Sequence, residues 1–250
     1  MICSIILVFM LSFTALHADH FTHLFEKGNE AYEQTHYEEA IQHYEEILAN
    51  DYESWEVYFN LGNAYYKQIN IGKAILNYEK AKRLQPDNED IQYNLELANL
   101  RVIDKIQTPP QFFLIDFFET VRDYFSIDGI SLITLFSYIT VMSLIMVVIV
   151  FKVGSFGRLL RSLIYFVSLL LILASIVLYA KIHEVNHTDY GIILVPKVNV
   201  YSSPDENGTE IFSLHEGAKV QLKNDTESWS QIRLSDGKTG WIKNETFDVI

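Results

Sequence analysis

Few residues in this 250-residue chain could do chemistry. His183 and His187 are spaced to share one face of a helix and could bind a metal, but no third ligand is evident near them. An interfacial histidine pair is therefore favoured over a metal site. Cys3 is the only cysteine and lies in an N-terminal apolar stretch, so disulfides and cysteine chemistry are excluded from the rest of the chain. No nucleophile, paired base or phosphate-binding loop stands in a catalytic context, and we expect neither enzyme activity nor a cofactor.

A repeat of 34 residues organises the N-terminal part of the chain. The residues that recur at this spacing are Gly28-Asn29 and Gly62-Asn63, Ala40 and Ala74, and Tyr44 and Tyr78. This period is typical of helix-turn-helix repeats, whose stacked hairpins form a groove instead of a catalytic pocket.

The second copy resembles the tetratricopeptide (TPR) consensus. The matching residues are Leu61, Gly62, Tyr65, Ala74, Tyr78, Ala81 and Pro86. The first copy matches less well, because Ala31, Ile47 and Tyr52 replace an aromatic residue, an alanine and the proline. Residues 88–103 then read as one amphipathic helix. We expect residues 19–107 to form two repeats and a capping helix.

The resemblance also implies a binding groove. Its concave positions hold the same three residue types in both copies. They are Phe25, Asn29 and Tyr32 in the first copy and Phe59, Asn63 and Tyr66 in the second. Paired asparagines at this place resemble those of TPR domains that hold the terminal carboxylate of a peptide. The basic residues of that clamp are replaced here by Phe25, Asp90 and Asn94, so we reject this specificity. A peptide-binding groove and consensus residues without a binding role remain equal alternatives.

Two long apolar segments follow the repeats. Residues 130–151 and 162–180 contain no charged residue, and each is long enough to cross about 30 Å of hydrocarbon as a helix. We predict transmembrane helices at 129–151 and 162–181, because neither segment has the polar face of a buried soluble helix. The loop 152–161 carries Lys152, Arg158 and Arg161 without an acid, which places it in the cytoplasm and both flanking domains outside.

Two other segments bear on this topology. Residues 1–18 resemble a secretory signal peptide cut near Ala18; no basic residue precedes its apolar stretch, so an uncut anchor is the alternative. Either outcome exports the repeats. Residues 108–128 place acidic side chains on one helical face and aromatic and aliphatic ones on the others, which predicts an amphipathic helix in the membrane interface. Packing of that helix against the repeats or the hairpin is the equal alternative.

Residues 190–250 change to short alternating segments with turn signals, typical of a small β-barrel. They resemble a bacterial SH3 domain, on the motifs Val198-Asn199-Val200-Tyr201, Leu214-x-x-Gly217, Trp229-x-x-Ile232 and Gly240-Trp241. Tyr201 stands where many envelope SH3 domains have arginine, which argues against an inherited wall-peptide specificity. Tyr201, Trp229 and Trp241 are the candidate binding surface, and a place partly in the barrel core is the alternative for them.

The predicted fold class is a multidomain membrane protein with all-α TPR hairpins, a two-helix transmembrane hairpin and a C-terminal all-β SH3-like barrel. This order resembles the E-type protein of the Bat (Bacteroides aerotolerance) family of bacterial envelope proteins. The resemblance implies a non-enzymatic inner-membrane component that acts beside von Willebrand A-domain membrane proteins and a MoxR-type ATPase, in stress tolerance or envelope maintenance.

Charge restricts the partners further. The net charge is −13, and residues 19–107, with 8 basic and 17 acidic residues, carry −9 of it. Nucleic acid is disfavoured and basic protein segments are favoured, although a solvated acidic surface explains the same charge. The sequence predicts a periplasmic, membrane-anchored adaptor that binds protein partners through its TPR and SH3 modules; the alternative is an anchor that binds peptidoglycan through the SH3 domain.

Overall fold

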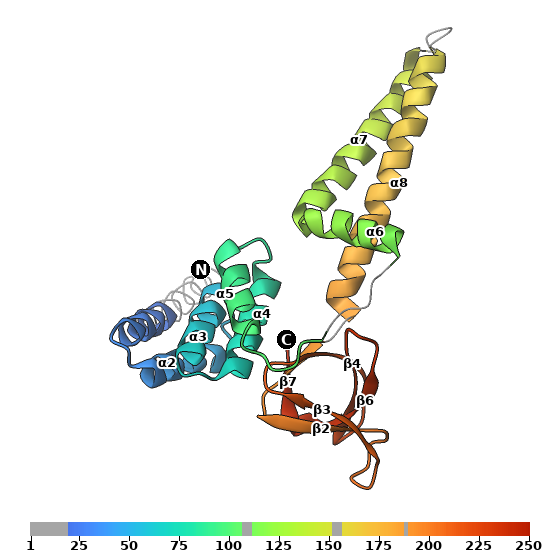
Figure 1. Ribbon diagram of the computed structural model, residues 1–250. Coiled ribbons are helices and arrows are strands. Elements are labelled where there is room, and N and C mark those ends of the chain that lie inside the picture. The colour runs from blue at the N-terminus through green and yellow to red at the C-terminus, as the bar shows by residue number, and fades with distance from the viewer. Residues whose placement is uncertain (1–19, 107–111, 152–156, 188–189) are drawn as a thin grey trace, which may run out of the picture. The chain divides into compact units, whose positions relative to one another are not determined.

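The computed structural model describes residues 20–106, 112–151, 157–187 and 190–250 (Figure 1), so the predicted signal segment lies outside the described residues. The chain divides into two units. One unit combines Met1–Thr108 with Asp189–Ile250, and the other is Pro109–Thr188. The predicted fold class is confirmed, because helical hairpins, two long apolar helices and an antiparallel sheet follow one another along the chain.

Helical hairpins form the N-terminal part of the first unit. A helix over residues 20–33 is followed by α2 (Tyr37–Ala49), α3 (Trp55–Lys67), α4 (Ile71–Leu84) and α5 (Glu89–Asn99). Ser54, Asn70 and Asn88 cap α3, α4 and α5 by accepting backbone N–H groups of the first turn. The helix α5 is shorter than the predicted 88–103, because the chain turns after Asn99 and buries Val102.

Small residues set the distance between the helices of each hairpin. A Cβ atom on Gly28 would lie 2.5 Å from the Tyr44 ring, and one on Gly62 would lie 2.7 Å from the Tyr78 ring. Tyr44 and Tyr78 are almost fully buried, so each glycine leaves the space that the tyrosine of the next helix fills. The spacing of these residues in the sequence therefore reflects packing within each repeat.

The C-terminal part of the first unit is a seven-stranded antiparallel sheet, which we call the barrel, with strand order β3-β2-β6-β5-β4-β1-β7. The strands are β1 (Tyr190–Ile193), β2 (Lys197–Tyr201), β3 (Glu210–His215), β4 (Lys219–Asp225), β5 (Trp229–Arg233), β6 (Thr239–Lys243) and β7 (Phe247–Val249), with a 3-10 turn at Asn244–Thr246. Alternate strand residues form its core. Two turns between strands hold glycines with positive φ, at Gly217 and Gly237.

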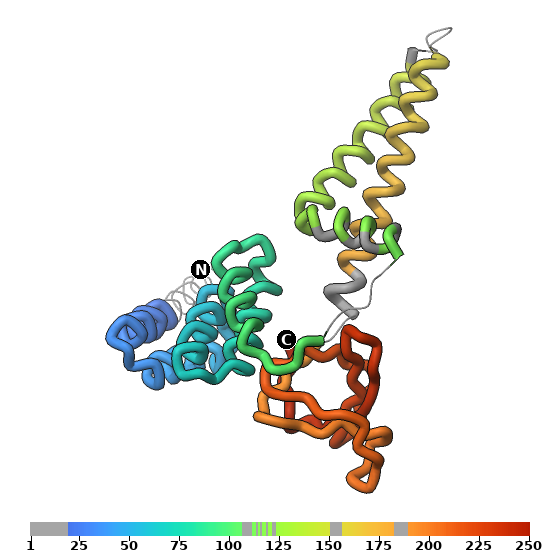
Figure 2. The backbone as a smooth tube through the Cα atoms, viewed as in Figure 1, coloured from blue at the N-terminus to red at the C-terminus, as the bar shows by residue number. Residues whose placement is uncertain are grey.

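The repeats and the barrel share one core. Ile192 of β1 is fully buried in the same apolar cluster as the helices, and β1 contacts α4. Gly217, in the turn between β3 and β4, lies against the repeats, because a Cβ atom there would be 2.9 Å from Val102 and 3.1 Å from Ile75. In Figure 2 the chain after α5 runs along the barrel, where Ile106 packs on the barrel core.

Polar contacts reinforce this junction. Glu216 Oε1 accepts the backbone N–H of Gly72 at 2.7 Å, so a barrel side chain caps the N-terminus of α4. Asp104 lies 3.1 Å from His215 Nδ1, between carboxylate oxygen and ring nitrogen, and also accepts the His215 backbone N–H. Lys219 and Glu79 form an ion pair at 2.9 Å. The two domains therefore form one body instead of two independent modules.

The second unit consists of α6 (Phe113–Tyr124), α7 (Ile127–Phe151) and α8 (Gly157–His187). Two segments are long and apolar enough to cross a membrane, Ile127–Val150 with 24 residues and Gly157–Ile182 with 26. They pack along each other through Ile130, Ala174 and Val177. Most other large apolar side chains of these helices are exposed, as in a hairpin whose outer surface contacts lipid.

The helix α6 belongs to the predicted amphipathic segment. Its aromatic residues are exposed in the second unit, with Phe113 at 68% and Phe117 at 66% of their surface. It contacts α8, and the Phe125 carbonyl that follows it accepts a hydrogen bond from Lys181 Nζ. The side chains of His183 and His187 lie outside the residues whose side chains the structure describes.

Candidate functional site

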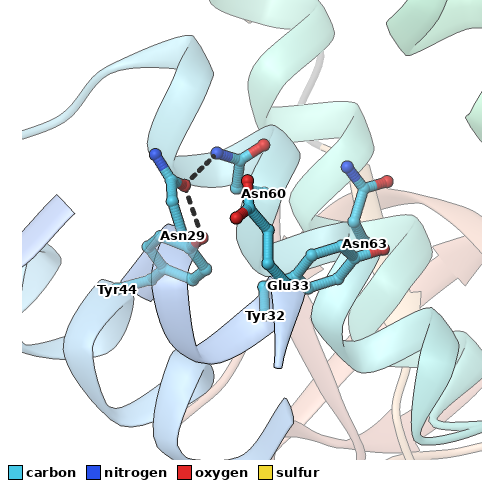
Figure 3. Close-up of a pocket in the computed structure, with 6 residues that line it drawn as sticks. All are labelled: Asn29, Tyr32, Glu33, Tyr44, Asn60 and Asn63. Atoms are coloured by element: carbon cyan, nitrogen blue, oxygen red, sulfur yellow. Dashed lines mark hydrogen bonds between the residues drawn. The ribbon is translucent and has the colours of Figure 1, made fainter. Parts of the chain in front are cut away.

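Two equivalent pockets lie along the repeats, and together they form a surface that we call the helical groove. The first pocket has a volume of about 190 Å³ and is lined by Asn29, Tyr32, Glu33, Tyr44, Asn60 and Asn63 (Figure 3). The second has about 200 Å³ and is lined by Tyr32, Asn63, Tyr66, Lys67, Tyr78, Asn94 and Leu97. Because Tyr32 and Asn63 line both pockets, the groove is continuous.

The asparagines of the groove are oriented by fixed partners. Asn29 Oδ1 accepts hydrogen bonds from the Tyr44 hydroxyl at 2.8 Å and from Asn60 Nδ2 at 2.9 Å. Figure 3 shows the Asn29 amide nitrogen pointing away from both partners. The acceptor of Asn29 is thus used inside the protein, and in the part of the chain that the structure describes its amide nitrogen has no hydrogen-bond partner. The Asn63 side chain repeats this arrangement one step along.

In the second pocket, Asn63 Oδ1 accepts from the Tyr78 hydroxyl and from Asn94 Nδ2, each at 2.8 Å. Burial raises the pKa of both Tyr44 and Tyr78 above the usual tyrosine value, so their hydroxyls stay protonated donors at neutral pH. Each tyrosine joins the two helices of a hairpin, and each asparagine pair joins successive hairpins. The network therefore keeps the groove walls in place before any partner binds.

The residues of the two predicted trios lie in different surroundings. Asn29, Tyr32, Asn63 and Tyr66 line the groove pockets, but Phe25 and Phe59 do not. Both phenylalanines pack against the core of the repeats, with ring centroids 6.0 Å from Tyr44 and Tyr78 respectively. Phe25 instead lines a neighbouring pocket with Phe21 and Tyr52. Their large apolar side chains fit packing better than contact with a hydrophilic groove.

The three predicted SH3 residues share one outer face of the sheet. Trp241 pairs with both Tyr201 and Gln231 across neighbouring strands, and Trp229 pairs with Lys243. The rings of Tyr201 and Trp229 meet edge to face with centroids 5.5 Å apart. Trp229 is nevertheless only 8% exposed, whereas Tyr201 and Trp241 are half-buried. Trp229 therefore packs under its neighbours and presents little free surface.

A wide pocket, which we call the acidic groove, opens beside Trp229 with a volume of about 600 Å³. Its lining residues are Pro204, Asp205, Glu206, Glu227, Ser228, Trp229, Lys243, Asn244 and Glu245. Lys243 is the one basic residue among them, and it is paired with Glu206 at 2.5 Å, an interaction that raises the lysine pKa. The remaining carboxylates give this groove a negative character, which suits a cationic ligand.

Sequence reasoning missed the charged rim and the polar partners of the helical groove. Glu33 and Lys67 line its pockets one repeat apart, and Asn60 and Asn94 supply the donors to Asn29 and Asn63. The 34-residue period could have found them, because Glu33 and Lys67 differ by one period and so do Asn60 and Asn94. Among the described residues, no group of three or more His, Cys, Asp or Glu side chains could hold a metal.

Comparison with known protein families agrees with both halves of the first unit. The family model of the tetratricopeptide repeat matches residues 25–89, and that of the bacterial SH3 domain matches residues 196–248. The chain carries a TPR domain and a bacterial SH3 domain. Both are non-catalytic modules, and TPR domains are protein-interaction modules. A comparison with curated proteins gives no match.

Proposed function

We propose that this protein is a non-catalytic scaffold, anchored in the bacterial inner membrane, that binds protein partners through the helical groove. The observation that carries this proposal is the pair of equivalent pockets whose asparagines are oriented in advance by buried tyrosines. A wall that is already ordered loses little conformational entropy when a peptide binds. Amide donors in it can hold the carbonyl groups of an extended chain.

The domain order supports a more specific proposal for the partners. The arrangement of TPR repeats, two apolar helices and an SH3 barrel supports a role in a Bat-type aerotolerance or envelope-stress complex. The partners there would be von Willebrand A-domain membrane proteins and a MoxR-type ATPase system.

Crosslinking in cells tests the groove. A photoreactive residue in place of Tyr66 should capture a membrane protein, whereas the same residue in place of exposed Lys82 on α4, away from the groove pockets, should not. Replacement of Asn29 is a poor control, because it would also break the hydrogen bond of Tyr44. Capture of the same proteins from both positions would count against the groove.

We also propose the topology, with residues 129–151 and 162–181 as spans and the TPR–SH3 body in the periplasm. The direct contacts between repeats and barrel support it, since two domains in contact lie on one side of a membrane. In a Cys3→Ser background, cysteines in place of Lys82 and Lys238 should react with a membrane-impermeant maleimide on intact spheroplasts. A cysteine at Ser155 should not react. Labelling of only one of the two body positions would exclude this topology.

A second candidate function is supported by the barrel. The acidic groove beside Trp229 suits the amino groups of wall peptides, so the protein could be a peptidoglycan-binding anchor. Full-length protein in detergent should then sediment with purified sacculi, and Glu227→Gln with Glu245→Gln should release it. The same charges neutralised at Glu46 and Glu89, on α2 and α5, are the matched control. Failure of the wild-type protein to sediment at low and moderate salt would remove this function.

A further inference from the structure

The side chains along the helical groove change charge from one repeat to the next. Glu33, Lys67 and Arg101 occupy the same position of successive repeats, 34 residues apart. Glu33 lines the first pocket and Lys67 the second. The Arg101 guanidinium lies 4.7 Å from the centroid of Tyr66, a residue of the second pocket. The groove is thus acidic at its first pocket and basic at its second.

These charges are available to a ligand. Within the part of the chain that the structure describes, neither Glu33 nor Lys67 forms an ion pair. Both side chains are exposed. In the view of Figure 3 the Glu33 carboxylate projects between the amides of Asn29 and Asn63, and all three residues line the first pocket. The two basic residues, Lys67 and Arg101, are a local exception in a domain with a net charge of −9.

We infer that the helical groove selects an extended peptide segment that carries both charges, with a basic side chain against Glu33 and a carboxylate between Lys67 and Arg101. This inference rests on the proposed function, that the groove binds protein partners. The helix of residues 20–33 and α3 touch through Asn29 and Asn60, and neighbouring helix axes are about 8–10 Å apart. About three residues of extended chain cover that distance. The two charges of the ligand should therefore be separated by two residues.

The site differs from a clamp for a terminal carboxylate. The positions that would supply the basic groups of such a clamp hold Phe25, Asp90 and Asn94, and none of these is a cation. Lys67 and Arg101 lie one helical turn further along their segments, beyond Asn63 and Leu97. The carboxylate of the ligand can come from an acidic side chain or from a chain end. Glu33 also requires a basic residue in the ligand, which a clamp for a terminal carboxylate does not require.

Peptide pools tested on the full-length protein in nanodiscs can establish this selectivity. Each amidated pool fixes two residues, separated by two randomised uncharged positions, as Lys with Glu, Lys with Lys, Glu with Glu, or Gln with Gln. A further pool has lysine and a free C-terminal carboxylate at the same separation. We expect the wild-type protein to retain the mixed-charge pools over the like-charge pools by about fivefold, the upper range for one exposed ion pair. The amidated and free-acid pools distinguish the two sources of the carboxylate.

Charge reversal provides the decisive comparison. Glu33→Lys should shift the preference to the Glu-Glu pool, and Lys67→Glu, which leaves Arg101 as the one cation of its site, should remove the preference for the mixed-charge pools over the Lys-Lys pool. The matched controls Glu46→Lys on α2 and Lys82→Glu on α4 change the net charge equally, outside the pockets, and should keep the wild-type preference. If the wild type retains the Lys-Lys pool best, or if all pools bind equally and depend on Tyr66, the inference is wrong and the groove still binds peptides. If no pool binds, both the inference and the proposed function fail.

Discussion

Gly217 gives the sharpest test of the junction between repeats and barrel. Its φ of +85° costs an L-residue about 1–2 kcal/mol, and the new Cβ of Gly217→Ala would lie 2.9 Å from Val102 and 3.1 Å from Ile75. Overpacking of this kind costs a further 1–3 kcal/mol, roughly. The variant should therefore lose about 2–5 kcal/mol of unfolding free energy. Gly237→Ala is the matched control: its φ is +90° and no atom lies within 4 Å of the Cβ, so only the backbone cost remains.

Two measurements separate the contributions. Urea unfolding of the full chain in detergent gives the loss of stability for each variant. Hydrogen exchange with mass spectrometry shows which segments are destabilised. The atoms nearest the new Cβ belong to the repeats, so the repeats should be affected. Amides of α4 and of the chain around Val102 should exchange faster in Gly217→Ala and should be unchanged in Gly237→Ala.

Two results would refute the reasoning. Equal losses of stability in the two variants would mean that the backbone strain acts alone and the packing of Gly217 on the repeats contributes nothing. Faster exchange confined to the barrel in Gly217→Ala would mean that the two domains unfold separately and do not share a core.

Three other predictions follow from single contacts. Glu216→Ala should cost about 1–2 kcal/mol in urea unfolding, because Gly72 N–H loses its cap, and Glu216→Gln should cost less, because an acceptor remains. Burial raises the pKa of Tyr44 and Tyr78 from 10.0 in the folded state, so the folded state holds these protons more tightly and stability should fall as the pH rises above about 10. Tyr44→Phe with Tyr78→Phe should flatten that alkaline loss in denaturation curves. Ile69→Asn should stabilise by about 1 kcal/mol in urea, since Ile69 is β-branched, 71% exposed and at a φ of 64°.

Each of these predictions has a contrary outcome. Equal losses for the alanine and glutamine variants of Glu216 would show that the contact does not act as a helix cap. An alkaline slope that the paired phenylalanines leave unchanged would mean that other groups set it, and Tyr58 is the next candidate because its pKa is also raised by burial. A destabilised Ile69→Asn would show that the exposed isoleucine contributes packing that outweighs its backbone strain.

The repeats and the strands could be predicted because their signals are local. Gly28 and Tyr44 meet within one hairpin, so close packing leaves a small and a large residue at a fixed spacing. The strands of the barrel alternate buried and exposed residues over a few positions. Periodicity of this kind survives in the sequence without knowledge of distant contacts.

The orientation and packing of the candidate groove side chains could not be predicted in the same way. The residue types predict a polar groove at Asn29 and Asn63, but the direction of the Asn29 amide depends on Tyr44 and Asn60, which lie 15 and 31 residues from it. Phe25 was expected in the groove because the resemblance to TPR domains maps it onto a concave position. Its ring is partly buried and packs against the core of the repeats, which removes apolar surface from water.

The sequence does not show which segments meet at the junction between repeats and barrel. The contacts of Gly72 with Glu216 and of Asp104 with His215 join residues 144 and 111 positions apart. Gly191, Ile192 and Ile193 of β1 are all buried, so this apolar run indicates burial on both faces of the strand but does not show that helices cover Ile192. Only the three-dimensional structure shows that two segments separated by a complete membrane hairpin form one body.

This arrangement makes the membrane hairpin an insertion within a single folded body. Closing a long loop costs little more than closing a short one, because the entropy cost grows only with the logarithm of its length, so the insertion is thermodynamically tolerable. Its consequence is kinetic, since Ile75 and Val102 stay uncovered until the barrel has been made and brought to the same side of the membrane. The hairpin must therefore be placed before the body can complete its core. A partner that binds the groove before that stage meets repeats whose α4 still lacks the cap from Glu216.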